Sequence, residues 1–281
     1  MDYIEILNTL TYLGIAFILF ILGKVAFKMV HKSLDINHIL VEDDNPAFAT
    51  AMTGYYTGLI IAIGGVIIGP SHGIAQDVLD MTIYGVLAIF LLHVSAWLNQ
   101  KFIFRNFKLK KEIVTDRNLG TGFIEAANYI STGIIVYGAI IGEGGGILSA
   151  LVFWTLAQIM FFLASKIYNL ITPYDIHKEI EKDNVAVGLG YAGALIAIAI
   201  LINNGIAHDF ESWADHLTYI TIDTGIGFLF LPLARLVTDK ILLPTRNLTD
   251  EIVNQEHPNV GAALIEAFAY IGGAVLISWT L

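Results

Sequence analysis

The chain contains no cysteine and little charge. Without cysteine, disulfides, zinc–thiolate sites and thiol nucleophiles are excluded. Charged residues make up 14% of the 281 residues, whereas roughly 25% is usual in a soluble domain. Hydrophobic residues make up 56%, and the mean hydropathy is +0.69. These proportions exclude a soluble enzyme, a disordered protein and a nucleic-acid-binding domain, and they predict a polytopic membrane protein in contact with the lipid bilayer.

The N-terminus lacks the basic segment that begins a cleaved signal peptide, so we expect the first apolar segment to remain as a helix. No segment alternates as barrel strands do. Eight segments have the roughly 20 apolar residues that a membrane-spanning helix needs. They are residues 5–30, 46–69, 78–102, 119–142, 146–171, 185–205, 216–241 and 259–281. The predicted fold is therefore all-α, with eight transmembrane helices.

Basic residues are confined to one side of this predicted bundle. All 15 Lys and Arg residues lie at the C-terminal end of an odd-numbered span or in the connection after it. These odd-to-even connections are long and charged, whereas the even-to-odd connections are short. The positive-inside rule places the long connections in the cytoplasm and both termini outside. The acidic residues are spread more evenly, so the net charge of −10 falls mainly on the outer face.

A two-helix unit occurs four times along the chain. Each even-numbered span begins with Asn followed by small residues, and Asn is a favourable helix N-cap. The four asparagines are Asn45, Asn118, Asn184 and Asn259. A short charged element containing Ile precedes each of them, and we expect it to lie along the inner membrane surface as an amphipathic helix.

The two halves of the chain also resemble each other. Residues 118–130 and 259–271 share seven of 13 positions, and residues 175–184 resemble 35–45. We therefore divide the chain into residues 1–142 and 143–281, each a membrane repeat of four helices arranged as two hairpins. Every hairpin crosses twice, so the hairpins share one orientation and any pseudo-symmetry axis runs along the membrane normal.

Tandem two-helix units with a charged connection and an Asn-small second helix resemble domain-of-unknown-function family 350, the YjfL-like bacterial inner-membrane proteins. The resemblance covers essentially the whole chain, as a doubled, eight-helix form of the four-helix members. It implies a multi-pass protein of the bacterial inner membrane. It implies no established activity and no catalytic residues.

Even-numbered and odd-numbered spans differ in side-chain size. The even spans repeat small residues at four-residue spacing, such as Gly54/Gly58, which lets helix backbones approach closely in lipid. The odd spans carry bulky stretches, such as residues 17–22 and 228–231. We expect the even spans to be central and the odd spans to face lipid. Tight packing without a pore and a small-residue lining for a solute path both fit this pattern.

Two glutamates occupy equivalent places within spans. Glu125 and Glu266 each follow the capping Asn by seven residues, about 10 Å along the helix. Tyr129 and Tyr270 follow one turn later on the same face. One hypothesis is that the glutamates form a proton or cation site; the alternative is that they are protonated or tyrosine-bonded groups that hold helices together. The corresponding positions of the other even spans hold Met52 and Tyr191.

Three further polar residues lie within odd spans. His93 is eight residues before Lys101 and is a candidate titrating partner of a glutamate, or else an interhelical hydrogen bond. Gln158 has the same spacing before Lys166. Asp223 lies about two turns into its span from the outer side and either ends a cation path or reaches interfacial water.

The outer connection at 208–216 reads HDFESWADH, so it could hold a divalent ion or be a solvated acidic loop. Glu143, in a glycine-rich turn, is interpreted as solvated. The chain has no HExxH, Walker A, G-x-S-x-G or dinucleotide motif, and its cytoplasmic connections are too short for an enzymatic domain. We expect no catalytic residues, no cofactor and no enzymatic activity.

Two hypotheses of different classes remain. The first is a channel or transporter that moves a proton or small cation through the bundle, using Glu125 and Glu266 as the ion site with Tyr129, Tyr270, His93 and Asp223 nearby. The second is a membrane scaffold, for example in envelope-stress sensing, that recruits a soluble cytoplasmic partner through its charged connections. A homo-oligomer is compatible with either hypothesis.

Overall fold

The computed structural model describes residues 3–68, 71–104, 110–142 and 144–281, and over these residues it confirms an all-α fold with eight helices long and apolar enough to span a membrane. Their ends agree with the predicted spans to within about one helical turn. They are α1 (Tyr3–Val30), α2 (Pro46–Ile67), α3 (Ile74–Phe102), α4 (Leu119–Ile141), α5 (Gly146–Ile171), α7 (Val185–Ile206), α8 (Trp213–Val237) and α10 (Val260–Ser278). The π-helical segment η3 (Thr238–Leu242) continues α8.

A short helical element precedes each of α2, α4, α7 and α10. These elements are η1 (His38–Glu42), η2 (Lys111–Thr115), α6 (Ile176–Glu181) and α9 (Leu248–Ile252). Each buries at least one Ile in the protein, at 5% exposure or less. The helix bundle therefore covers part of the apolar surface of each element, and its position along the membrane surface stays a prediction.

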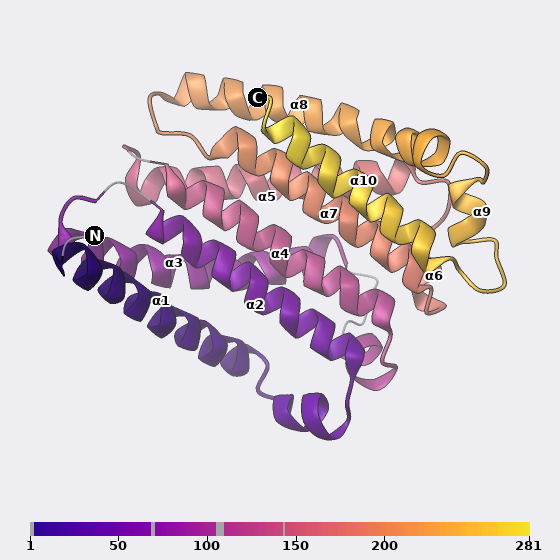
Figure 1. The fold of residues 1–281 in the computed structure, drawn as a ribbon, viewed down its shortest axis with the longest axis horizontal. Helices are drawn as coiled ribbons and strands as arrows, with labels where there is room; N and C mark the ends of the chain where they lie inside the picture. Colours follow the sequence, from indigo (N-terminus) through magenta and orange to yellow (C-terminus); the bar gives the residue numbers. More distant parts are fainter. Residues whose placement is uncertain (1–2, 69–70, 105–109, 143) are drawn as a thin grey trace.

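The spanning helices form two layers (Figure 1). In one layer α2, α4, α7 and α10 lie side by side in that order, and in the other α1, α3, α5 and α8 do the same. The short elements gather at one end of the bundle, and both termini lie at the opposite end. We call the first the basic end. Arg105 and Lys108, which sequence analysis places there, lie outside the described residues, as does Glu143.

Glycines bring α2, α4 and α7 into backbone contact. A Cβ atom on Gly58 would lie 2.1 Å from the Tyr129 carbonyl oxygen, and one on Gly133 would lie 2.2 Å from the Gly58 oxygen. At the boundary between the halves, a Cβ on Gly188 would lie 2.5 Å from the Gly120 Cα. Small residues thus create the close packing that holds helices together in lipid.

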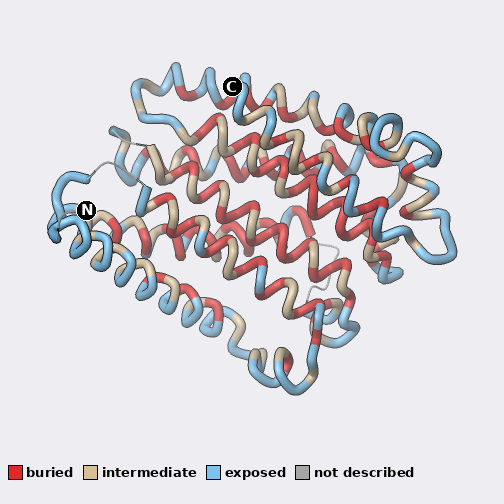
Figure 2. The backbone as a smooth tube through the Cα atoms, in the orientation of Figure 1, coloured by how far each residue is buried: buried red, intermediate tan, exposed pale blue. Residues whose placement is uncertain are grey.

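The helices of the even-numbered spans are more buried than those of the odd-numbered spans, with one exception (Figure 2). In α4 and α7 most of the apolar core of the helix is buried, whereas α1 exposes most of its length. The bulky stretches of the odd spans supply exposed side chains such as Phe17 and Leu229. The exception is α10, which ends its layer and exposes Leu264 and Phe268.

Candidate functional site

The four repeated asparagines are structural joints. The side-chain oxygen of each accepts the N–H three residues later and so caps α2, α4, α7 or α10. In the first three asparagines along the chain, the side-chain amide nitrogen donates to the backbone carbonyl of an Ile in the short element of the next unit. These bonds join Asn45 to Ile113, Asn118 to Ile180 and Asn184 to Ile252, at 2.8 to 2.9 Å. The amide nitrogen of Asn259 instead donates to Glu251 Oε2 at 2.9 Å.

Glu125 lies two turns below its Asn joint and is buried at 5% exposure. The Gln100 amide donates to Oε1 at 3.0 Å, and the Asn128 amide donates to Oε2 at 3.3 Å. Tyr129 also hydrogen-bonds this carboxyl. All three partners are uncharged, and in the described part of the chain no basic residue forms an ion pair with Glu125. An ionised Glu125 would therefore have no cationic partner among the described residues.

A cavity of about 180 Å³ lies beside Glu125, between α1, α2, α4 and η2. Glu125 and Tyr129, both buried, line one end of the cavity. The exposed residues Val30, Ser33 and Lys110 line the other. The cavity therefore opens at the basic end and leads to the carboxyl. Its walls are largely apolar and include Phe27, Phe48, Ala51 and Met52.

Polar and aromatic rings continue from Tyr129 deeper into the bundle. The Tyr129 ring centroid is 5.1 Å from that of Tyr55, and the Tyr55 hydroxyl is 3.4 Å from His93 Nε2. The Tyr55 hydroxyl donates to the Gly23 carbonyl at 2.6 Å. His93 Nδ1 is 2.8 Å from the Ile89 carbonyl, which can only accept, so this nitrogen carries the proton. Tyr129, Tyr55 and His93 thus follow one another from Glu125 into the bundle, and the two tyrosines meet through their rings.

An apolar layer lies beyond His93. Ala62, Ala88, Leu91 and Val136 pack together from α2, α3 and α4 and are buried at 1% exposure or less. A second cavity of about 360 Å³, lined in part by Asp80, lies between this layer and the end of the bundle that carries the termini. The polar chain from Glu125 therefore stops at a packed apolar layer.

Glu266 has different neighbours from Glu125. Arg235 Nη1 lies 2.7 Å from Glu266 Oε1, and Nη2 donates to Thr249 Oγ1 at 3.0 Å. The guanidinium also lies 5.5 Å from the centre of the Tyr174 ring. A Cβ on Gly190 would lie 2.4 Å from Glu266 Oε2, so this glycine makes room for the carboxylate. Glu266 is therefore paired with a cation supplied by the chain, and the two glutamates do not form one shared site.

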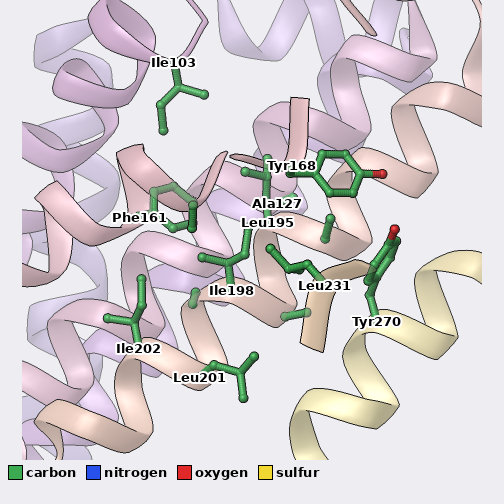
Figure 3. Close-up of a cluster of buried hydrophobic side chains, with 14 of the residues drawn as sticks. Ile103, Ala127, Phe161, Tyr168, Leu195, Ile198, Leu201, Ile202, Leu231 and Tyr270 are labelled. Atoms are coloured by element: carbon green, nitrogen blue, oxygen red, sulfur yellow. The ribbon is translucent and has the colours of Figure 1, made fainter. Parts of the chain in front are cut away.

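Tyr270 and Tyr168 lie next to each other beside this ion pair (Figure 3), with ring centroids 5.6 Å apart. Their hydroxyls and Glu266 Oε2 have no hydrogen-bond partner among the described residues. The Tyr270 hydroxyl still interacts with the Glu266 carboxyl, as Tyr129 does with Glu125.

The remaining predicted site residues lie apart from both glutamates. Asp223 accepts a hydrogen bond from Asn204 at 3.0 Å and is 8% exposed. Both amide atoms of Gln158 are buried without a partner among the described residues. In the outer connection, His216 stacks on Phe153 at 4.4 Å. No group of three or more metal-ligating side chains gathers there or elsewhere in the described residues.

Sequence reasoning missed Arg235, Gln100 and Asn128. Arg235 was counted with the basic end of its span, although it lies five residues before the closing Lys240. A charge that deep in a span needs a partner, and this was the signal that could have paired it with Glu266. Gln100 and Asn128 carry no comparable signal, because amides are common near helix ends.

Comparison with known families identifies the chain. The family described as Domain of Unknown Function (DUF350) matches residues 2–140 and again residues 144–281. The chain belongs to the DUF350 family. The two matches fit the doubled form expected from sequence. A UPF0719 transmembrane protein of Aquifex aeolicus (strain VF5) is 21% identical over 264 residues, covering 91% of this DUF350 chain and 94% of the relative. No solved structure matches the chain.

Proposed function

We propose that this DUF350 protein binds a proton or small cation at Glu125 and moves it through the first half of the bundle. The observation that carries the proposal is a buried carboxyl, without a basic partner in the part of the chain that the structure describes, at the inner end of a cavity that opens at the basic end. A charge at this depth is costly unless it is paired or neutralised, so a cation or proton that enters the cavity finds a favourable site.

The positive-inside rule supports a cytoplasmic position for the basic end, in the inner membrane of a bacterium. The cavity then loads from the cytoplasm. Tyr129, Tyr55 and His93 extend from Glu125 toward the apolar layer. Passage to the other side requires that layer to open, so we assign the described conformation to an inward-facing state.

The scaffold hypothesis has less support. Several described charges of the connections pair within the chain, such as Lys182 with Glu179 at 2.7 Å and Arg117 with Asp43 at 3.6 Å. Each short element also buries at least one Ile in the bundle. These connections have structural partners already, which leaves less of their surface for a soluble protein.

Flux in proteoliposomes tests the proposal. Wild type, Glu125→Gln and Glu256→Gln are reconstituted, and pH- and cation-sensitive dyes report flux under an imposed potential. Glu256 is exposed and lies after α9, so it is the matched control. We expect flux in wild type and Glu256→Gln and none in a folded Glu125→Gln protein. Flux in wild type no greater than in empty liposomes, for protons and for every cation tried, would refute transport.

A pull-down assay tests the scaffold alternative in parallel. Lys178 is exposed on α6, and Lys178→Glu reverses its charge without touching the cavity. If the protein is a scaffold, Lys178→Glu should weaken recruitment of a soluble partner, while Glu125→Gln should leave recruitment unchanged. The transport proposal predicts the opposite pattern in the flux assay.

A further inference from the structure

The cavity of the first half and the Arg235 site of the second half are equivalent places. When α3 and α8 are aligned on Lys101 and Lys240, their buried positions coincide, for example Leu92 with Leu231 and Asn99 with Thr238. This alignment pairs Ala96 with Arg235. Ala96 packs in the same apolar cluster as Phe27, Met52 and Tyr129, which line the cavity. A methyl group therefore stands in the first half where the second half has a guanidinium.

The neighbours of Arg235 have counterparts around the cavity. Tyr174 precedes Asp175, and Leu34 precedes the matching Asp35. Thr249 lies three residues before Ile252, as Lys110 lies three residues before Ile113, and both isoleucine carbonyls accept an Asn joint. Leu34 and Lys110 both line the cavity. The two halves thus build the same site around a glutamate, but among the described residues a cation bonds the glutamate in the second half alone.

We propose that the cavity binds a small organic cation, with a guanidinium or ammonium group on Glu125 and a short apolar body, in the place that the Arg235 side chain takes in the second half. This inference rests on the proposed function and specifies its substrate class. The second half is the internal example: a guanidinium there bonds the equivalent carboxylate at 2.7 Å and lies 5.5 Å from an aromatic ring.

The size and walls of the cavity fit an organic cation better than a metal ion. A volume of about 180 Å³ exceeds the roughly 150 Å³ of an engineered cavity that holds benzene. A hard cation such as Ca²⁺ takes about six to eight oxygen ligands, whereas most of the lining here is apolar. Phe27, Phe48 and Tyr129 line the cavity, and aromatic rings attract cations.

Among the described residues, two basic side chains line the cavity, His31 and Lys110, and neither replaces the ligand. His31 Nδ1 bonds the Phe27 carbonyl at 3.1 Å, and Lys110 lies at the mouth. Its ammonium donates to Ser33 Oγ at 2.8 Å, and both residues are exposed. It forms no ion pair with Glu125. A solvent-exposed charge at the mouth is also screened by salt, so it does not prevent a cation from entering.

Calorimetric titration of the full chain in lipid nanodiscs tests this inference. The probe is propylguanidinium, which is the arginine side chain without its Cα, and the control ligand is uncharged propylurea. We expect wild type and Glu256→Gln to bind propylguanidinium at least about tenfold more tightly than propylurea. Glu125→Gln should weaken propylguanidinium binding by at least about tenfold.

Two substitutions introduce into the first half the residues that stand at the equivalent positions of the second half. Ala96→Arg places a tethered guanidinium beside Glu125 and should abolish propylguanidinium binding while the protein stays folded, as thermal unfolding will report. Met52→Tyr introduces the residue that stands at the equivalent position in α7 and reduces the cavity volume, so it should also weaken binding. It provides an independent test if Ala96→Arg does not fold.

The inference is overturned if folded wild type does not bind propylguanidinium, if propylurea binds equally well, or if Glu125→Gln leaves binding unchanged. Should propylguanidinium fail to bind while proton or metal-ion flux still depends on Glu125, the organic substrate class is wrong and the proposed function stands. If propylguanidinium binds but no cation is transported, the binding site is confirmed and the proposed transport is refuted.

Discussion

Arg235 and Glu266 form a buried ion pair between α8 and α10, with Nη1 2.7 Å from Oε1 and side-chain exposures of 13% and 0%. Such a pair neutralises a charge that would otherwise be costly within a membrane span. It also sets the two halves of the chain apart, because the equivalent glutamate in the first half has only uncharged partners.

Removing the arginine alone should destabilise the second half strongly. Arg235→Met leaves Glu266 buried and unpaired, and breaking a buried ion pair in this way costs about 3–5 kcal/mol. Adding Glu266→Met removes the remaining charge and should restore most of that free energy of unfolding. Thermal and denaturant unfolding in nanodiscs measures both variants. Equal destabilisation in the single and double variants would contradict this account of the pair.

The Asn joints should differ in strength according to whether the Asn amide bonds the backbone of the next unit. Asn184→Ala removes a helix cap, worth about 1 kcal/mol, and leaves the buried Ile252 carbonyl unpaired, worth about 1–3 kcal/mol more. Asn259→Ala should cost about 1 kcal/mol, because it loses the cap and an exposed bond to Glu251.

Asn184→Asp separates the two contributions. Aspartate keeps the capping oxygen but has no N–H to donate, so its free energy of unfolding should fall between those of wild type and Asn184→Ala. If Asn184→Ala and Asn259→Ala prove equally destabilising in nanodiscs, the joint to the next unit contributes nothing measurable.

Glycines of α2 should respond to alanine according to where they face. A Cβ on Gly58 would lie 2.1 Å from the Tyr129 carbonyl oxygen, so Gly58→Ala must push α2 and α4 apart. Overpacking of this kind costs roughly 1–3 kcal/mol or more. Gly64, in the same helix, has no atom within 4 Å of the added Cβ. Gly64→Ala should therefore be neutral or slightly stabilising, since alanine favours helix. Similar unfolding midpoints for the two variants would contradict the close contact.

The helices were predictable because the properties that define them are local. A membrane span is an apolar run, and an Asn before a run of small residues marks its start, so Asn45 and Asn184 located α2 and α7 within a residue or two. The partner of each Asn amide was not predictable. The bonds reach across about 60 to 70 residues of sequence, to a carbonyl of Ile113, Ile180 or Ile252 that no side-chain pattern marks.

The candidate site was predictable in part. The position of Glu125 and its tyrosine within a span followed from sequence, because both lie on one helix. The cavity did not, because it arises from what neighbouring helices lack. Ala96 and Met52 are ordinary core residues in sequence, and only packing reveals that they leave space where Arg235 and Tyr191 fill it in the second half. The symmetry of the two glutamates in sequence thus concealed their different surroundings.

His31 should make stability depend on pH. It lies just after α1, lines the cavity and stacks on Phe27 at 4.2 Å. Burial lowers its pKa below the ordinary value of 6.5, although its bond to the Phe27 carbonyl opposes the shift, and the positive charges of His93 and Lys110 lower it further. The folded protein therefore keeps His31 neutral at pH values where the unfolded chain takes up a proton. The free energy of unfolding should fall as pH decreases below about 6.5, until the lowered pKa of the folded state is reached.

His31→Gln removes this titration and keeps a polar side chain of similar length. Its unfolding temperature in nanodiscs should decline less than that of wild type between about pH 6.5 and 5, while the two proteins should run parallel above about pH 7. Other charged groups of the same connection, such as His38, are present in both proteins, so their contribution cancels in the difference between the two curves. If both curves decline equally below pH 6.5, His31 is not held neutral by burial in the folded state. The acid sensitivity would then have to come from groups that the two proteins share.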